Sequence, residues 1–313
     1  MFSLFKIQRL IANTRHLHTE QLKKGLIHVI GKERKDFLQG LLTNDIHHLT
    51  EYKPGIYSHV LNNLGRVMYD VIISNDKNNP DACFIECDIN VLTQLTKHLK
   101  IYKLRRKVDI IPVSDNFNVW VIFGDDLEQI STEGCEPSDV PSLISDPRLK
   151  CLGYRMILAK DKTPGDVVKP EKSLNISESD YKLLRYKKGV AEGSEEIVPG
   201  KSLPLEFNCD FLNGVSFHKG CYIGQELTAR TNYTGVVRKR IMPIDFSSPI
   251  PADTTAEIVN EKNKSVGKLK AVHNLSGLGL IRITDALNSS SLSVCDITVK
   301  ISKPDWWPID VKS

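Results

Sequence analysis

The pattern of apolar residues changes near residue 241. Before that point, strand-like runs such as residues 119–124 and 154–159 are interleaved with helix-like stretches such as residues 88–99. After it come short alternating runs divided by Gly, Pro, Asn and Ser, namely "IMPIDF", "TAEIVN", "SVGKLKAVHN", "GLGLIRI" and "LSVCDITVKIS". Interleaved strands and helices predict an α+β domain, and short alternating strands predict a small β-barrel. We therefore expect an α+β domain over residues 19–240 and a C-terminal β-barrel over residues 241–313.

The first 18 residues, "MFSLFKIQRLIANTRHLH", form a basic segment of their own. They contain Lys6, Arg9 and Arg15, no acidic residue, and apolar residues at helical spacing. This composition is typical of a mitochondrial transit peptide rather than of a secretory signal, whose apolar stretch is longer and uninterrupted. We predict a transit peptide over residues 1–18 and a protein of the mitochondrial matrix, with the basic end of a cytosolic protein as the alternative. No apolar run approaches the roughly 18 residues that a membrane span needs, so we expect no span.

The rest of the chain is nearly neutral. Of the net charge of +4, the leader carries +3, which leaves +1 for the remaining residues. A protein that binds nucleic acid through phosphate contacts needs a strongly positive surface, so we expect no nucleic-acid partner. The seven cysteines show no regular spacing, which argues against a disulfide framework. Cys83 and Cys87 share one face of a strand-like run, and we predict that both are buried core thiols.

Local patterns predict several elements of the larger domain. Apolar runs on both sides of an Asn-Asn-Leu-Gly turn predict a hairpin over residues 57–74. Residues 88–99 begin with an aspartate that suits a helix N-cap. The stretch 131–147, rich in Ser, Pro and acidic residues, predicts a surface loop. Ser177 and Asp180 form a capping-box pattern that opens a further helix.

Residues 217–226, "FHKGCYIGQE", give one cysteine unusual surroundings. Cys221 lies between two glycines, on a loop that runs into a helix-like stretch. Free N–H groups and the positive end of the helix dipole favour a thiolate at such a place, and Lys219 would add positive charge. Gly220 and Gly224 are expected to take positive φ and to leave room for close approach. A small thiol that only fills space is the structural alternative.

One thiolate does not hold a metal centre by itself. An iron–sulfur cluster or a structural zinc ion needs about four ligands, and the residues around Cys221 supply no second one. If Cys221 binds metal, the remaining ligands have to come from another molecule.

The stretch "GVSFHKGCYIGQELTAR" resembles the K-G-C-[YF]-x-G-Q-E signature of the YgfZ branch of the GcvT-like proteins. The similarity runs through most of the chain. Six further segments fall in the order of the family: "FLQGLLTNDI", "LGRVMYDVII", "LKIYKLRRKV", "DPRLKCLGYR", "RYKKGVAEG" and "LPLEFNCDFLNGVSF". With the basic leader, the chain is most similar to the mitochondrial iron–sulfur cluster assembly factors of this branch.

This resemblance implies a folate-binding α+β fold, with two interlocked subdomains in a ring-like arrangement and a C-terminal β-barrel. It also implies a factor that helps to insert [4Fe-4S] clusters into aconitase-type and radical-SAM enzymes, lipoate synthase among them, together with A-type iron–sulfur carrier proteins. Cys221 would then be a redox thiol or a ligand of a cluster shared with such a carrier. The other motif residues would shape the loop, the helix start and the contact surface: Lys219, Gly220, Tyr222, Gly224, Gln225 and Glu226.

The chain departs from the folate-dependent aminomethyltransferases of the family at three pocket positions. Tyr69-Asp70 stands where those enzymes carry an Asp-Asp pair, and Cys221 takes the place of the aspartate in K-x-D-F-I-G. Lys187 stands where a carboxylate would meet the pterin, so donors would face donors. Glu206 keeps its "LPLE" context, and Asp70 is equally interpretable as a buried, capped carboxylate. A tetrahydrofolate-dependent one-carbon transferase with Asp70, Lys187 and Glu206 in its pocket is therefore the alternative function, and we expect the protein not to be a classical enzyme.

Two patterns near the barrel receive structural interpretations. Arg238 and Arg240 alternate along "VVRKR" and are predicted to lie on a solvated strand face, with a clamp for a polyglutamate tail or an acidic partner as the alternative. Trp306 and Trp307 are expected to anchor the C-terminal tail against the barrel.

Overall fold

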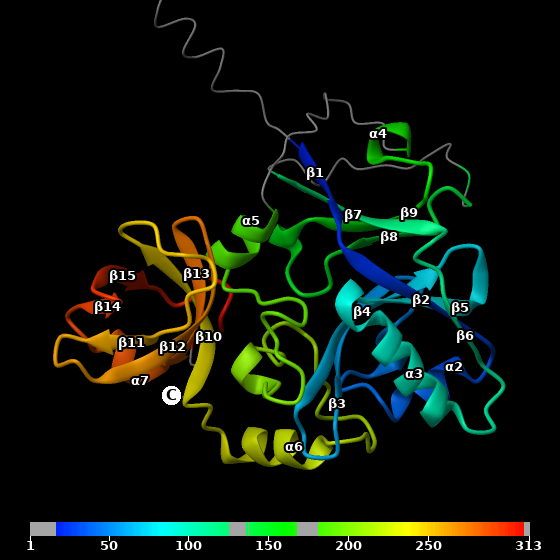
Figure 1. Cartoon of the computed structure of the whole chain (residues 1–313). Helices are drawn as coiled ribbons and strands as arrows, with labels where there is room; N and C mark the ends of the chain where they lie inside the picture. The colour runs from blue at the N-terminus through cyan, green and yellow to red at the C-terminus, as the bar shows by residue number, and fades with distance from the viewer. Residues whose placement is uncertain (1–16, 125–135, 137, 168–180, 310–313) are drawn as a thin grey trace, which may run out of the picture.

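The computed structural model describes residues 17–124, 136, 138–167 and 181–309. These residues form three sheets. Figure 1 shows the sheets around residues 188–224, which connect α5 to α6 and which we call the central segment. Residues 1–16 of the predicted leader lie outside the described range. Its last two residues, Leu17 and His18, begin strand β1 and pair with Gly124 and Phe123.

The larger domain contains two antiparallel sheets. One has the strand order β1-β7-β9-β8 and the other the order β3-β4-β5-β2-β6. The strands are β1 (Leu17–Leu22), β2 (Lys24–Ile30), β3 (Gly55–Leu61), β4 (Val67–Asp76), β5 (Asn79–Asp88), β6 (Asp109–Pro112), β7 (Phe117–Gly124), β8 (Ser142–Ser145) and β9 (Tyr154–Ala159). The chain starts in the first sheet, builds the second with β2 to β6, and returns to the first at β7. This crossing confirms the predicted interlocked α+β arrangement.

Short helices cover and connect these sheets. They are α2 (Arg34–Gln39), α3 (Leu92–Lys103), α4 (Pro164–Val167), α5 (Tyr181–Lys187), α6 (Gln225–Thr234) and α7 (Ile283–Leu287), with 3-10 turns at η1 (Ile46–His48), η2 (Ile89–Val91), η4 (Lys150–Leu152) and η5 (Leu205–Phe207). As predicted, Asp88 caps the start of the helical stretch, because its side chain accepts a hydrogen bond from the Asn90 N–H at 2.9 Å. None of the described helices combines the length and apolarity that a membrane crossing requires.

The C-terminal unit is a closed barrel with the strand order β10-β13-β12-β11-β14-β15. Its strands are β10 (Lys239–Phe246), β11 (Glu257–Asn260), β12 (Ser265–His273), β13 (Ser276–Arg282), β14 (Leu292–Val294) and β15 (Ile297–Ile301). Closure pairs every strand edge and removes the exposed edges that an open sheet would leave. Trp307 is buried in the barrel core, and the Trp306 indole N–H donates to the Lys188 carbonyl at 2.7 Å. The predicted anchoring role of this pair is therefore confirmed.

Three sequence-based predictions compare as follows with the observed elements. The hairpin over residues 57–74 is confirmed by β3 and β4, which are joined by a turn closed from Gly65 N–H to the Asn62 carbonyl. The surface loop over residues 131–147 is wrong in its last part, because β8 pairs with β9 there and buries Ile144. The capping-box pair at residues 177 and 180 lies outside the described residues.

Arg240 corrects the predicted solvated face of "VVRKR". Its guanidinium is buried and bonds both carboxylate oxygens of Asp210 at 2.8 Å. It also lies 3.9 Å from the centroid of the Phe211 ring. Arg238 is exposed and precedes β10, which begins only at Lys239. The alternation therefore does not describe one strand face, because the chain at Arg238 is not yet part of the strand.

Candidate functional site

The Cys221 thiol is exposed on the loop that leads into α6. Figure 1 shows α6 between the barrel and the five-stranded sheet. The helix begins at Gln225, four residues after the cysteine, and Gly224 is its N-cap. This confirms the predicted loop-to-helix setting. It also argues against a cysteine that merely fills space, because an exposed side chain occupies no core volume.

Lys219 turns away from solvent and fixes the base of this loop. Its side chain is buried, and its Nζ donates to the backbone carbonyls of Gln39, Leu42 and Asn44 at 2.7, 2.6 and 2.8 Å. An ammonium has three donors, so all of them are satisfied. Burial lowers the pKa of Lys219 to about 8. The three acceptors come from a segment far away in the sequence, so Lys219 ties the loop to that segment, and an effect of its charge on the cysteine stays a prediction.

The two glycines of the loop have different roles. Gly224 has φ +77°, and a Cβ at this position would lie 2.2 Å from the Asn62 carbonyl oxygen. Only glycine fits such a close approach to the β3–β4 turn without displacement of the backbone. Gly220 does not have the positive φ that we predicted, and a Cβ there would meet no atom within 4 Å. A side chain at position 220 would therefore point into open space.

Contacts of the remaining motif residues fix the Cys221 loop to the rest of the protein. Tyr222 is buried, and its ring centroid lies 5.0 Å from the Lys219 ammonium. The Ile223 N–H donates to the Gly40 carbonyl at 3.1 Å. Gln225 closes a local turn, since its N–H donates to the Tyr222 carbonyl at 3.3 Å. Glu226 is exposed in the first turn of α6, where a carboxylate favours the helix dipole.

The other described cysteines have different surroundings. Cys83 and Cys87 are buried in the core of the five-stranded sheet, as predicted, and burial raises the pKa of Cys83 to about 12. Cys209 is buried as well, whereas Cys151 and Cys295 are exposed. Within the described ranges, no cluster of three or more His, Cys, Asp or Glu side chains could hold a metal ion. A metal centre at Cys221 would thus need ligands from a partner.

The three residues of the predicted folate pocket have separate surroundings. Asp70 is buried and accepts a hydrogen bond from the Gly193 N–H at 3.1 Å, while burial raises its pKa. Lys187 is exposed at the end of α5. Glu206 lines a cavity of about 300 Å³ between η5, α6 and the start of β10. Burial also raises the pKa of Glu206. No hydrogen bond or ion pair joins these three side chains in the described structure, and their role in a folate pocket stays a prediction.

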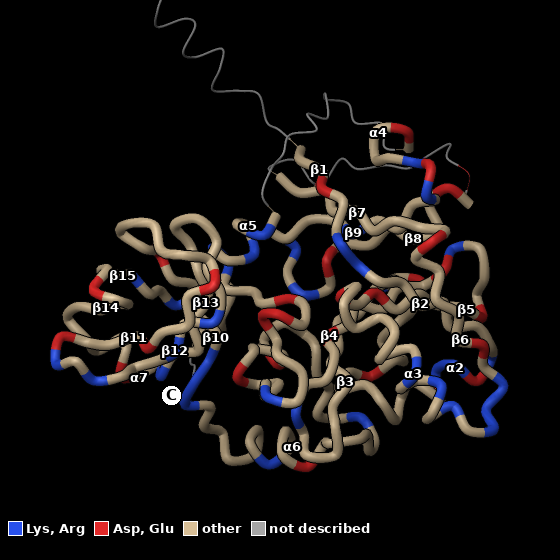
Figure 2. The backbone as a smooth tube through the Cα atoms, in the orientation of Figure 1, with Lys and Arg blue, Asp and Glu red and all other residues tan. Residues whose placement is uncertain are grey.

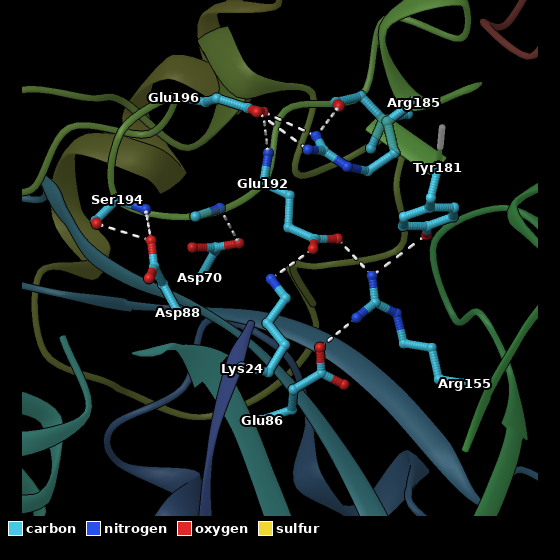
Figure 3. Close-up of polar contacts among 12 residues, drawn as sticks. Lys24, Asp70, Glu86, Asp88, Arg155, Tyr181, Arg185, Glu192, Ser194 and Glu196 are labelled. Atoms are coloured by element: carbon cyan, nitrogen blue, oxygen red, sulfur yellow. Dashed lines mark hydrogen bonds and ion pairs between the residues drawn. The ribbon is translucent and has the colours of Figure 1, made fainter. Parts of the chain in front are cut away.

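A buried network of ion pairs lies next to Asp70 (Figure 3). Arg155 from β9 contacts Glu86 from β5 and Glu192 from the central segment, and so links the two sheets. Glu192 also pairs with Lys24 at 2.5 Å and with Arg148 at 2.6 Å. Although burial alone would raise it, these cations hold the pKa of Glu192 well below its ordinary value.

This network is not apparent in the sequence. Its members are single charges scattered over the chain, and no motif brings them together. Asp146, near the end of the stretch predicted to be a loop, forms a buried bidentate pair with Arg148, which directly follows that stretch. The local pattern D-x-R was the only available signal. The network joins the central segment to both sheets.

Comparison with known proteins gives consistent results. Residues 238–309 match the family model described as "CAF17, C-terminal beta-barrel domain". The chain is 37% identical over 309 residues to a Mus musculus protein named "Iron-sulfur cluster assembly factor IBA57, mitochondrial", with 92% of this chain and 85% of the relative covered. A Homo sapiens protein of the same name is 37% identical over 305 residues, with 90% and 83% covered.

Among solved structures, the fold is similar to that of the glycine cleavage system aminomethyltransferase T from Bartonella henselae. The TM-score is 0.73 at 12% sequence identity, over 96% of this chain and 89% of the other. This similarity confirms the predicted fold and carries no statement about activity. The relatives are named as mitochondrial proteins, which confirms the predicted mitochondrial localisation. Because two relatives at 37% identity are covered over 85% and 83% of their length, the chain belongs to the IBA57 family of mitochondrial iron–sulfur cluster assembly factors.

Proposed function

We propose that this protein assists the assembly of [4Fe-4S] clusters in the mitochondrial matrix and shares a cluster with an A-type carrier protein through Cys221. The observation that carries the proposal is an exposed thiol on a loop that is held in place by hydrogen bonds, in a chain whose described part contains no cluster of three or more metal-ligating side chains. Membership of the IBA57 family supports the general role. The A-type carrier as the partner follows from the resemblance of the "KGCYIGQE" loop.

Cluster chemistry explains why one exposed cysteine would be useful here. A cubane cluster needs about four ligands, so a cluster bound by Cys221 would lie at an interface and would be completed by cysteines of the carrier. Such a cluster can be handed on, because neither protein encloses it. The cage around Lys219 and the close packing of Gly224 hold the loop in place before a partner arrives. A ligand that is already positioned loses little conformational freedom on binding.

The clients in this proposal are aconitase-type and radical-SAM enzymes, lipoate synthase among them. Replacement of Cys221 by Ser in cells tests this part. We expect lower aconitase-type activity and less protein-bound lipoate, with normal amounts of folded protein. A scaffold in which Cys221 has only a structural role predicts normal activity of these enzymes instead. Normal activity in the Cys221→Ser strain would therefore overturn the proposed role of the thiol.

The direct test uses the purified protein and an A-type carrier under reducing, anaerobic conditions with iron and sulfide. We expect a visible cluster chromophore in a complex of the two proteins, and its loss with Cys221→Ser. Cys295→Ser is the matched control, because Cys295 is also exposed but lies in the barrel. An equal chromophore in wild type and Cys221→Ser would contradict a shared cluster. In a separate mixture without reductant, attack of the Cys221 thiolate on a carrier whose cysteines are supplied as a disulfide would give a mixed disulfide and a released carrier thiolate, and this outcome would indicate a redox thiol.

A folate-dependent transferase is the second candidate, favoured by the cavity of about 300 Å³ that Glu206 lines. The other two pocket positions do not fit a folate, because Lys187 is exposed and the Asp70 carboxylate is already hydrogen-bonded to the Gly193 N–H. If the folate site were retained, tetrahydrofolate at 100 times its Kd would stabilise the protein by about 2.7 kcal/mol. We expect no change in melting temperature with tetrahydrofolate, and a clear rise would favour this second function.

A further inference from the structure

A strongly basic stretch covers α3 and the turn that follows it. Residues 89–108 carry six Lys and Arg side chains and no acidic one, a charge of +6, so the rest of the chain sums to −2. The cations are Lys97, Lys100, Lys103, Arg105, Arg106 and Lys107. No ion pair joins any of these six side chains to another described residue, and all but the half-buried Lys103 are exposed. Figure 2 shows these residues as blue segments at the side of the molecule remote from the barrel.

Apolar side chains protrude among these cations. Ile101 is 60% exposed, Tyr102 42% and Leu104 84%. The opposite face of α3 is buried through Leu95 and Leu99, which belong to the core of the five-stranded sheet. The helix is therefore fixed by one face and presents a mixed basic and apolar surface on the other, a pattern typical of helices that lie on membranes.

The apex of this surface has an unusual backbone. Leu104 has φ 51° and ψ −118°, and the Arg106 N–H donates to the Lys103 carbonyl at 3.0 Å. These values describe the first central residue of a type II′ turn, a position at which glycine is favoured. A leucine there is strained and gains nothing from burial, because its side chain is in solvent. Because burial of the side chain does not offset this strain, the protruding Leu104 points to a contact with something outside the folded chain.

A groove continues the apolar surface beneath the helix. It has a volume of about 500 Å³ and lies between α3 and β6, an edge strand of the five-stranded sheet. Its lining includes Leu92, Ile101 and Pro112 together with the stems of Lys97 and Lys100. The apolar and basic residues thus form one continuous surface, which we call the α3 surface.

We propose that the α3 surface docks this protein on an anionic phospholipid bilayer. Leu104 and Ile101 would enter the boundary between headgroups and acyl chains, while the surrounding Lys and Arg side chains would reach the phosphates. The groove along α3 offers space for part of a lipid. An acidic protein partner fits this surface less well, because the apolar side chains protrude instead of forming pockets, and the cations have no fixed partners that would orient them. A nucleic acid would leave the protruding leucine in water.

Vesicle co-sedimentation of the purified full chain tests this proposal. We expect binding to phosphatidylcholine vesicles that contain cardiolipin, little binding to phosphatidylcholine alone, and release by high salt. Each cation near an anionic surface contributes about 1 kcal/mol, which is about a five-fold change in partitioning. The double variant Lys100→Gln/Arg105→Gln should therefore lower partitioning by about 25-fold. The matched control Lys262→Gln/Lys264→Gln removes the same charge from the exposed β11–β12 turn and should leave it unchanged.

The variant Leu104→Gly separates a structural role from a role in binding. Glycine suits the type II′ turn, so this variant should raise the melting temperature while it weakens binding to cardiolipin vesicles. Binding that is unaffected by Leu104→Gly, or lowered equally by the control pair, overturns the proposal. So does the absence of any preference for cardiolipin vesicles. Binding of a polyglutamate peptide or an RNA oligonucleotide without binding of vesicles would instead assign the α3 surface to an acidic protein or to a nucleic acid.

Discussion

Replacement of Lys219 by Met removes the ammonium that three backbone carbonyls surround near the Cys221 loop, and keeps an unbranched apolar side chain of similar length. The change deletes three hydrogen bonds, of 2.6 to 2.8 Å, to carbonyls of the segment from Gln39 to Asn44. Each net hydrogen bond is worth about 1 kcal/mol, and more where one partner is charged. The free energy of unfolding should therefore fall by about 3 kcal/mol. The exposed Lys262→Met is the control and should change it by less than about 0.5 kcal/mol.

Urea unfolding of wild type, Lys219→Met and Lys219→Arg distinguishes two roles of Lys219. One is the hydrogen bonding of its ammonium to the three carbonyls, and the other is an effect of its positive charge on Cys221. Three carbonyl oxygens around one nitrogen suit a compact ammonium, and the larger planar guanidinium does not fit the same space. Arg should therefore be nearly as destabilising as Met. It should also fail to restore the cluster chromophore with the carrier. If Arg restores both stability and the chromophore, then the positive charge matters and the geometric argument is refuted.

Three further predictions follow from single contacts. Gly224→Ala should cost at least about 2 kcal/mol in urea unfolding because of the positive φ and the contact with the β3–β4 turn, whereas Gly220→Ala should stay within about 0.5 kcal/mol; equal effects would contradict the geometry. Burial lowers the pKa of His59 from its ordinary 6.5 to about 3. The unfolded chain therefore binds the extra proton between these values, and the free energy of unfolding should drop by about 1.4 kcal/mol per unit as the pH falls below 6.5; His59→Gln should lose this dependence. Arg240→Ala should cost about 3 kcal/mol because it breaks a buried ion pair, and the additional change Asp210→Ala should recover part of this loss in a double-mutant cycle.

The sequence was sufficient for features that depend on neighbouring residues. Periodicity identified the barrel, the β3–β4 hairpin and the buried face of Cys83 and Cys87, because a strand or helix places its side chains by local geometry alone. The loop-to-helix position of Cys221 was predictable for the same reason. The glycine at 224 was assigned correctly, although the partner that enforces it, the Asn62 carbonyl, was not visible in the sequence.

Features that depend on distant contacts were not predictable. Lys219 stands two residues from Cys221 in the sequence, which suggested an electrostatic role, but its acceptors belong to a segment about 180 residues earlier. The buried carboxylate Glu192 meets Lys24, Arg148 and Arg155 only because two sheets and the central segment converge. No local pattern encodes such convergence. The short strand β8 was hidden for a related reason, since its composition is that of a loop and only pairing with β9 makes it a strand.

The orientation of Lys219 bears on what Cys221 can do. A redox thiol reacts as the thiolate, which a nearby cation, a metal or a helix N-terminus stabilises. The lysine closest to Cys221 in the sequence is buried and donates to three carbonyl oxygens. A metal ligand does not need that assistance, because a bound cation deprotonates the thiol that coordinates it. Of the two roles predicted for Cys221, we therefore propose that of a cluster ligand, because a bound cluster would itself supply the positive charge that stabilises the thiolate.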